Sequence, residues 1–179
     1  FYSMRLLLLI FIIFSFSCKE QKRYANNNLS EYQKNVNDFF KDASVSPLKS
    51  KDLKNFKGLD FFESDSTYIV SARIKKTPES LPFKMKTTSN IPADFRIYGK
   101  VIFNLNNQDI ELFVYENLEY LDVEGYENYL FLPFSDQTNG FETYGGGRYI
   151  DIYFKENDSV IIDFNKAYNP PVSYTHLTL

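Results

Sequence analysis

The stretch FRIYGKVIFNLNNQDIELFVY, residues 95–115, decides the fold class, because apolar and polar residues alternate through both of its halves. Asn106 and Asn107 separate the halves, and asparagine is common in the tight turns of β-hairpins. The residues that share one face are Val101, Phe103 and Leu105 in the first half and Ile110, Leu112 and Val114 in the second. The stretch therefore predicts an antiparallel hairpin with one apolar face.

Further segments with a period of two lie on both sides of this hairpin. The predicted strands are residues 67–73, 83–88, 129–134, 148–154 and 159–164. We expect the last two to pair with each other across the polar loop 155–158. The chain also contains 14 Tyr and 18 Phe, and both residue types favour half-buried strand positions. The pattern predicts an α+β protein that is mainly β, with a curled antiparallel sheet or a small barrel.

A single amphipathic helix is predicted before the strands. Ser30 is a suitable N-cap, and Ser46 and Pro47 end the helical pattern that runs to about Asp42. The apolar residues that recur at helical spacing are Tyr32, Val36, Phe39 and Phe40. We expect this N-terminal helix to pack on the sheet through that stripe.

The N-terminal residues resemble the leader of a bacterial lipoprotein. Arg5 precedes an apolar run over residues 6–14, which is too short to cross a bilayer comfortably, and Ser17 and Cys18 follow it. We expect a signal peptide over residues 1–17, with Met4 as the true start and residues 1–3 not native, and lipid attachment at Cys18. An uncleaved anchor helix or an ordinary signal peptide with a chance cysteine are the alternatives.

The predicted lipid anchor implies a location and a domain layout. Residues 18–29 form the lipidated cysteine and a polar tether, and residues 30–171 form one globular domain. Lys19 is not the aspartate that is linked to inner-membrane retention, which favours the outer membrane of the cell envelope. The expected partner is therefore a membrane, contacted through lipid.

Composition limits the chemistry that this chain can support. It contains one cysteine, Cys18, and one histidine, His176, so Cys/His catalysis, a Ser-His-Asp triad in the body of the domain and a thiolate zinc site lack parts. The net charge of -3 and the lack of a basic cluster give no reason to expect a nucleic-acid partner. No cofactor is indicated.

A glycine run at residues 145–147 is the strongest candidate for a site. Its backbone N–H groups can form an anion-binding nest, and Arg148 directly after it can add a bidentate fork for a carboxylate or phosphate. The other interpretation is a glycine bulge that bends the sheet, with Arg148 paired to Asp151 or Glu142. The sequence Gly-Lys-Ser/Thr is absent here, so this is no phosphate-binding P-loop.

Three unusual strings occur in order in the second half of the chain: LFLPFSD (130–136), ETYGGGRYID (142–151) and IDFNKAYNP (162–170). Together with SPL (46–48) and FKGLDFF (56–62) upstream, they resemble the family of domain of unknown function 1684. The resemblance implies no activity, but it marks a set of candidate ligand-binding positions. These are Tyr144, Gly145, Gly146, Gly147, Arg148, Asp151, Asp163, Asn165, Tyr168 and Asn169.

The final residues depart from that family. Members continue with two cysteine-containing stretches, whereas here the chain reads VSYTHLTL over residues 172–179, which resembles a translated sequencing adapter. We expect residues 172–179 to be a sequencing artefact, which removes His176 from the inventory of reactive residues. The resemblance implies two further cysteines in the native protein, as a disulfide or a metal pair.

Three functions are compatible with these observations. The first is a lipid-anchored binding module that holds a small anionic ligand at the glycine-rich turn. The second is an interaction or structural protein of the envelope that uses an aromatic-rich surface. The third is a hydrolase in which Glu142, Asp151 or Asp163 acts as general base, and for this the catalytic residues stay unassigned.

Overall fold

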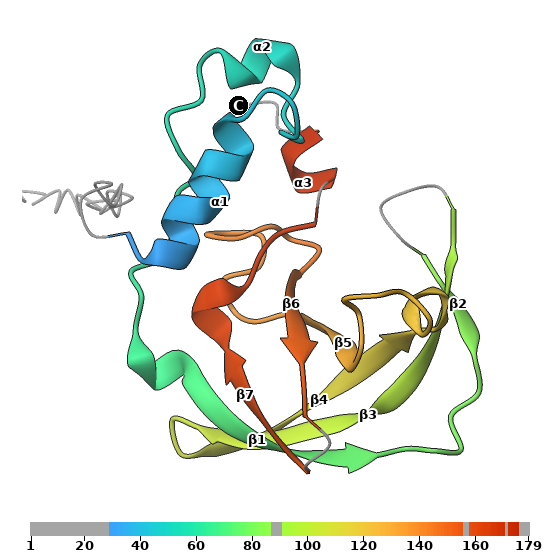
Figure 1. The fold of residues 1–179 in the computed structure, drawn as a ribbon. Helices are drawn as coiled ribbons and strands as arrows, with labels where there is room; N and C mark the ends of the chain where they lie inside the picture. Colours follow the sequence, from blue (N-terminus) through green and yellow to red (C-terminus); the bar gives the residue numbers. More distant parts are fainter. Residues whose placement is uncertain (1–28, 87–90, 156–157, 171, 176–179) are drawn as a thin grey trace, which may run out of the picture.

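The computed structural model describes residues 29–86, 91–155, 158–170 and 172–175, and it consists mainly of one antiparallel sheet of seven strands (Figure 1). The strand order is β6-β5-β4-β3-β1-β7, and the short β2 pairs with β3. The bounds are β1 Ile69–Lys76, β2 Phe83–Met85, β3 Ala93–Leu105, β4 Gln108–Asn117, β5 Tyr129–Phe134, β6 Arg148–Tyr153 and β7 Ser159–Asp163. The sheet curls into a half-barrel, which confirms the predicted fold class.

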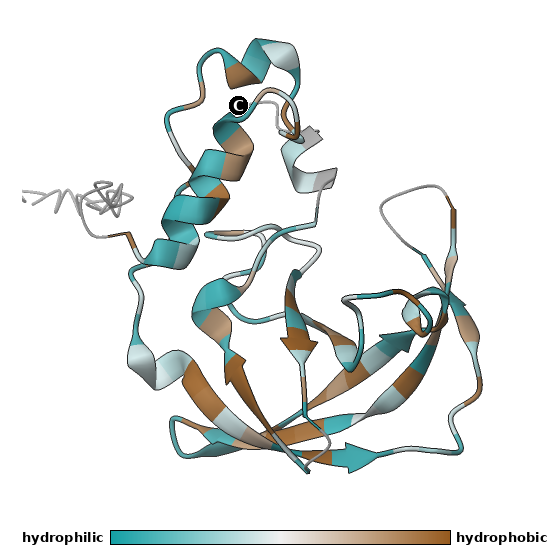
Figure 2. Cartoon of the chain, viewed as in Figure 1, coloured by the Kyte–Doolittle hydropathy of each residue, from teal (hydrophilic) through white to brown (hydrophobic). Residues whose placement is uncertain are grey.

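The hydrophobic core lies on the inner face of this curl. Alternate residues of β1, β5 and β7 are buried, so the core has the period of two that the sequence predicts. The buried residues are Val70, Ala72, Ile74, Val101, Phe103, Val114, Leu130, Leu132, Ile150, Ile152, Phe154, Val160 and Ile162. Figure 2 shows this distribution as apolar segments along the strands, whereas the helix that precedes them is largely hydrophilic.

The predicted hairpin is present as β3 and β4. Asn106 and Asn107 both have positive φ, at 52° and 61°, as a two-residue turn of the hairpin type requires. Phe103 faces Ile110 across the ladder, so the two apolar sets share a face as predicted. The register shifts between Ile97 and Gly99, which marks a β-bulge toward the middle of β3.

The predicted pairing of the last two strands is wrong. β6 pairs with β5, placing Ile150 opposite Leu132, and β7 pairs with β1, placing Ile162 opposite Val70. The two strands therefore stand at opposite ends of the sheet order. Alternation reports which face of a strand is buried and not which strand lies beside it, so sequence adjacency was misleading here. A backbone bridge between Tyr149 and Tyr168 adds a short connection to the edge of β6.

Helix α1 (Glu31–Lys41) begins with a capping box, in which Ser30 and Gln33 satisfy each other's backbone N–H groups. It lies beyond one open end of the half-barrel, together with α2 (Ser50–Leu53) and α3 (Val172–Thr175) (Figure 1). The described residues also contain three short 3₁₀ turns: η2 Ser66–Tyr68, η3 Leu118–Tyr120 and η4 Phe164–Lys166. None of the helices within the described ranges reaches the length and apolar character that a membrane crossing requires.

The buried face of α1 differs from the predicted apolar stripe. Gln33, Asn37 and Phe40 are buried, whereas Phe39 is 49% exposed. Gln33 donates to the carbonyl of Phe62, and the side chain of Asn37 accepts from the backbone of Leu59. The amide side chains of α1 therefore satisfy polar backbone groups of the loop before β1. Phe40 is the buried aromatic residue of the predicted stripe, and its ring packs on those of Phe56 and Tyr174.

We expect Ser30→Ala to lower the free energy of unfolding by about 1 kcal/mol, because it removes the side-chain acceptor of the capping box. Ser30→Gly is the control, since glycine at an N-cap costs only a few tenths of a kcal/mol relative to serine. Urea unfolding followed by circular dichroism measures both variants. Equal losses in the two variants would contradict this account of the cap.

Some sequence-based predictions lie outside the described residues. These are the leader over residues 1–17, Cys18, the tether up to residue 28, and His176 in the last segment. They remain predictions.

Candidate functional site

The predicted site residues of β6 separate onto two faces of the sheet. Arg148 lies on the inner face with Phe134 and the core, whereas Asp151 is exposed on the outer face. Residues three positions apart on a strand point to opposite faces, so the expected ion pair between Arg148 and Asp151 is wrong. The expected alternative, Glu142, is also not the partner, because Arg148 pairs with Asp136.

Arg148 is held in a nearly closed environment at the start of β6. Its Nη2 donates to Asp136 Oδ2 at 2.5 Å and lies 3.4 Å from the hydroxyl of Thr138. The guanidinium lies 5.0 Å from the ring centre of Phe134 and 5.7 Å from that of Phe62. Only 12% of the side chain is exposed, and its Nε is buried with no hydrogen-bond partner among the described residues.

Asp136 is the natural counter-charge of this arginine. Partial burial opposes ionisation of the carboxyl, but the hydrogen bonds from Thr138 and the charge of Arg148 outweigh it and hold the pKa of Asp136 below its usual range. The side chain of Asp136 is 41% exposed, so the pair is buried at the arginine and open to solvent at the carboxylate.

The glycine run forms a turn that leads into β6. Gly147 has φ of +97°, its N–H donates to Tyr144 O, and a Cβ there would lie 2.8 Å from the carbonyl of Phe134. A Cβ on Gly146 would meet the ring of Tyr144 at 2.5 Å. The β5–β6 register is continuous up to Arg148, so the predicted bulge is wrong: the run is a turn before the strand. Gly145 and Gly146 are exposed beside Arg148.

Asp151 accepts hydrogen bonds from two tyrosine hydroxyls on the outer face of the sheet. Tyr129 from β5 and Tyr168 from the segment after η4 both donate to Asp151 Oδ1, each at 2.8 Å. Burial, together with the negative charge of Asp151, raises the pKa of both hydroxyls well above the ordinary tyrosine value. The carboxylate therefore ties the segment that contains Tyr168 to the sheet.

These tyrosines predict a loss of stability at alkaline pH. Their pKa values are raised on folding, so the contribution is complete below the ordinary value of 10.0 and is lost as pH rises above it, because the unfolded chain releases the protons first. Above pH 10.0 the free energy of unfolding should fall as pH rises. We expect this fall to be smaller in Tyr168→Phe than in the wild type, by up to about 1.4 kcal/mol per pH unit.

Urea unfolding at a series of pH values measures that slope. Tyr68→Phe is the control, because the Tyr68 side chain is 42% exposed. A slope that falls equally in both variants would contradict the assignment.

The remaining predicted residues order the loop before β1. Asp163 accepts from the backbone of Asn165 and so caps η4. Asn165 in turn exchanges two hydrogen bonds with the backbone of Asp65, both at 2.9 Å. Asn169 Oδ1 is buried without a partner among the described residues, next to Tyr174. The predicted residues thus fall into three separate groups: the turn before Arg148, the hydrogen bonds at Asp151, and the residues after β7 that bond to the loop before β1.

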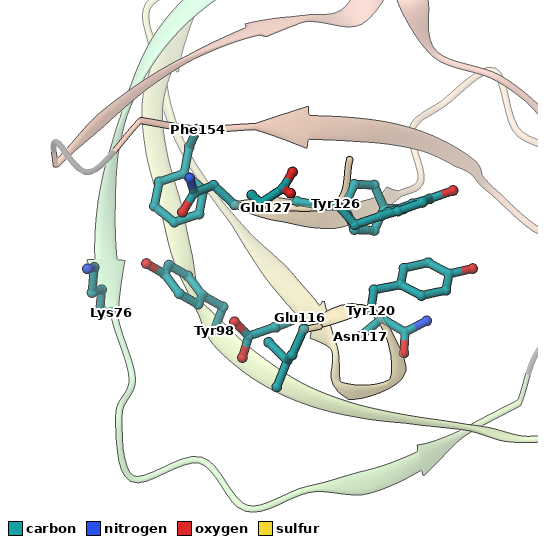
Figure 3. Close-up of a pocket in the computed structure, with 11 residues that line it drawn as sticks. Lys76, Tyr98, Glu116, Asn117, Tyr120, Tyr126, Glu127 and Phe154 are labelled. Carbon is teal, nitrogen blue, oxygen red and sulfur yellow. The ribbon is translucent and has the colours of Figure 1, made fainter. Parts of the chain in front are cut away.

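A pocket that the sequence analysis missed lies at the other end of β6 (Figure 3). Its volume is about 340 Å³, and none of its lining residues belongs to the predicted site. The lining consists of Lys76, Tyr98, Glu116, Asn117, Tyr120, Leu121, Tyr126, Glu127, Asn128, Tyr129 and Phe154. Arg148 begins β6 and Phe154 follows its last residue, so the pocket lies about 20 Å from Arg148 along the strand.

The bulge in β3 shapes one wall of this pocket. It occurs between Ile97 and Gly99, so Tyr98 has no partner residue in the ladder, and its ring packs 5.2 Å from that of Phe154. Gly99 permits this arrangement, because a Cβ there would lie 2.4 Å from the carbonyl oxygen of Lys75. Gly99, a glycine inside an otherwise alternating strand, is the local signal from which this feature could have been predicted.

The turn between β4 and β5 supplies the opposite wall. Asn128 has φ of 60°, and its carbonyl accepts from the backbone of Phe154. The rings of Tyr120 and Tyr126 lie 4.4 Å apart, and Tyr126 packs 5.5 Å from Tyr129. Glu116, which also lines the pocket, forms an ion pair with Arg96 at 2.5 Å.

Nothing in the described part of the chain resembles a metal site: no three His, Cys, Asp or Glu side chains lie together in a way that would hold an ion.

A family model described as "Protein of unknown function (DUF1684)" matches residues 54–178. The chain belongs to this family. The fold is similar to the solution NMR structure of an uncharacterized protein from Haloarcula marismortui, with a TM-score of 0.61 at 24% identity over 80% of this chain and 77% of that one. The search of curated proteins found no match. The family and the fold are thus known, and neither carries a stated activity.

Proposed function

We propose that this DUF1684 protein is a lipid-anchored binding module of the bacterial cell envelope, and that its ligand is a small anion held by Arg148 and the turn before it. The observation that carries the proposal is that the guanidinium of Arg148 has a buried N–H group without an acceptor among the described residues. Arg148 donates through Nη2, while its buried Nε has no partner among the described residues. A buried donor without an acceptor is rare in folded proteins, and a bound ion is one of its explanations.

The surroundings of Arg148 suit a carboxylate or a phosphate. The rings of Phe62 and Phe134 flank the guanidinium and shield it from water, which strengthens its hydrogen bonds. Gly145 and Gly146 are exposed in the turn that precedes it, and backbone N–H groups of such turns can bind an anion. Asp136 is the one competing anion in contact with Arg148 within the described residues, and its partial exposure lets it turn toward solvent when a ligand takes its place.

Calorimetric titration of the full chain with inorganic phosphate and with acetate tests this proposal. We expect saturable binding in the wild type that is lost in Arg148→Lys, because lysine keeps the charge but has no planar fork. Arg73→Lys, at an exposed position of β1, is the matched control and should bind as the wild type does. Absence of binding in the wild type, or equal binding in Arg148→Lys, would refute the proposal.

The lipid anchor rests on the order of features in the leader. A basic residue, a short apolar run and the pair Ser17-Cys18 follow one another as in lipoprotein precursors. When the gene is expressed in a bacterium that is fed radiolabelled palmitate, we expect label in the wild type, no label in Cys18→Ser, and the labelled protein in the outer-membrane fraction. Label in Cys18→Ser, or none in the wild type, would overturn the anchor.

The alternative functions receive no specific support from the geometry. The carboxylates considered for a hydrolase lie apart: Glu142 is exposed in a loop, Asp151 is on the outer face, and Asp163 caps η4. The most exposed apolar side chains, Leu81, Ile91 and Phe141, belong to separate loops. Ligand binding therefore remains the preferred function.

A further inference from the structure

We infer that the pocket between Tyr98, Phe154, Tyr120 and Tyr126 is a second ligand site, and that it takes a neutral polyhydroxylated ring such as a sugar unit. It lies at the opposite end of β6 from Arg148, with the core residues Ile150 and Ile152 on the strand between them. The inference is therefore independent of the proposed anion site.

The walls of the pocket are aromatic. Figure 3 shows Tyr98 and Phe154 together on one side and Tyr120 and Tyr126 on the other. Phe154 is buried and supports Tyr98, whereas the partly exposed rings of Tyr98, Tyr120 and Tyr126 can contact the C–H surface of a ring-shaped ligand. The volume of about 340 Å³ falls at the lower end of the range of small-molecule sites, which suits a ligand of one ring.

The polar groups of the pocket include both donors and acceptors. The oxygen of the Asn117 side chain is occupied by the backbone of Glu119, and its amide nitrogen donates to no described residue. Glu116 and Glu127 each use one carboxylate oxygen, for Arg96 and for the backbone of Gly125, and retain the other. Hydroxyl groups act as donors and acceptors at once, so a polyhydroxylated ligand matches this mixture.

The charges around the pocket balance, so the lining favours neither an anion nor a cation. Glu116 is neutralised by Arg96, and Glu127 and Lys76 supply one charge of each sign. A neutral ligand suits such a lining, because its binding needs no net charge in the pocket. This distinguishes the pocket from the Arg148 turn, where the arginine side chain is mostly buried and its Nε is unpartnered.

The walls are also held in place before any ligand arrives. The bulge at Gly99 fixes Tyr98, and the hydrogen bond from Phe154 to Asn128 joins the end of β6 to the opposite turn. Preformed walls reduce the entropy lost on binding.

Saturation-transfer NMR on the full chain with glucose and with N-acetylglucosamine tests the inference. We expect transfer to the ring C–H protons of at least one sugar, and a loss of affinity of about tenfold in Tyr126→Ala, which removes one wall. Glu127→Gln replaces a carboxylate of the pocket lining by an amide of similar shape, and it should also weaken binding. This variant serves as the test if Tyr126→Ala folds poorly. Arg148→Lys should leave the sugar signal unchanged.

The outcomes separate the two sites. Sugar binding that is lost in the Tyr126 or Glu127 variant and kept in Arg148→Lys supports the inference. No transfer to either sugar, or transfer that survives both pocket variants, overturns it. Loss of phosphate binding in Arg148→Lys bears on the proposed anion site alone.

Discussion

Gly99→Ala is expected to lower the free energy of unfolding by about 3 kcal/mol. A Cβ at this position would lie 2.4 Å from the carbonyl oxygen of Lys75 and 3.0 Å from the Cα of Lys76. Both contacts are to backbone of the neighbouring strand β1, which cannot move aside without breaking the β1–β3 ladder. The cost therefore arises from forced separation of two central strands.

Gly145→Ala is the matched control for this prediction. Its nearest neighbours would be backbone atoms of Gly140 at 3.7 Å and beyond, and its φ is not positive, so alanine fits there without strain. We expect it to be neutral or slightly stabilising, because alanine reduces the freedom of the unfolded chain. Urea unfolding compares the two, and similar midpoints would contradict the close approach of β1 and β3 at Gly99.

Asp136→Asn is expected to cost about 2 kcal/mol, more than Arg148→Met costs. The asparagine variant leaves a mostly buried guanidinium without a carboxylate, whereas the methionine variant leaves a carboxylate that is 41% exposed and can be hydrated. Methionine also fills the space between the rings of Phe62 and Phe134. The order of the two losses is the informative result.

This ion pair also predicts a pH dependence. The pKa of Asp136 is lowered on folding, so the contribution is complete above the ordinary carboxyl value of 3.8 and is lost as pH falls below it. Unfolding measured from neutral pH down past 3.8 should show this loss in the wild type and not in Asp136→Asn. A greater cost for Arg148→Met, or equal acid sensitivity in Asp136→Asn, would contradict the assigned pair.

The sheet was predictable from the sequence because strand periodicity reports burial directly. Leu130 and Leu132 of β5 alternate with half-buried residues, and the turn at Asn106 and Asn107 sets the register of the central hairpin. Pairing between distant strands was not predictable in this way, since β7 and β1 are joined by contacts that no local pattern encodes. The error over β6 and β7 follows from that difference.

The candidate site was only partly predictable for the same physical reason. Arg148 and the glycine run were found because unusual residues stand together in the sequence. Arg148 and Asp151 are three residues apart on one strand, so their side chains point to opposite faces of the sheet. Asp136 was missed because it is twelve residues from Arg148 and reaches it only through the turn before β6. The pocket at Tyr98 assembles from distant strands and turns, and Gly99 was its one local signal.

The half-barrel thus presents two chemically distinct ends that share β6. One end holds a buried arginine beside a glycine turn, and the other holds tyrosine rings around amide and carboxylate groups. Helix α1 and the loop before β1 lie at the arginine end, where Phe62 contacts the guanidinium. We expect a ligand at Arg148 to change the position of this loop, because Phe62 in the loop contacts the guanidinium.

The proton on Arg148 Nε gives the most direct test of the proposed function, because that atom is buried and unpartnered among the described residues. Its ¹H–¹⁵N resonance can be assigned as the side-chain signal that disappears in Arg148→Lys, and then followed while inorganic phosphate is added. We predict a saturable downfield shift of this resonance as Nε gains an acceptor, while the side-chain signal of Arg73 stays in place. A resonance that does not move at saturating phosphate would contradict the proposal that Arg148 binds an anion.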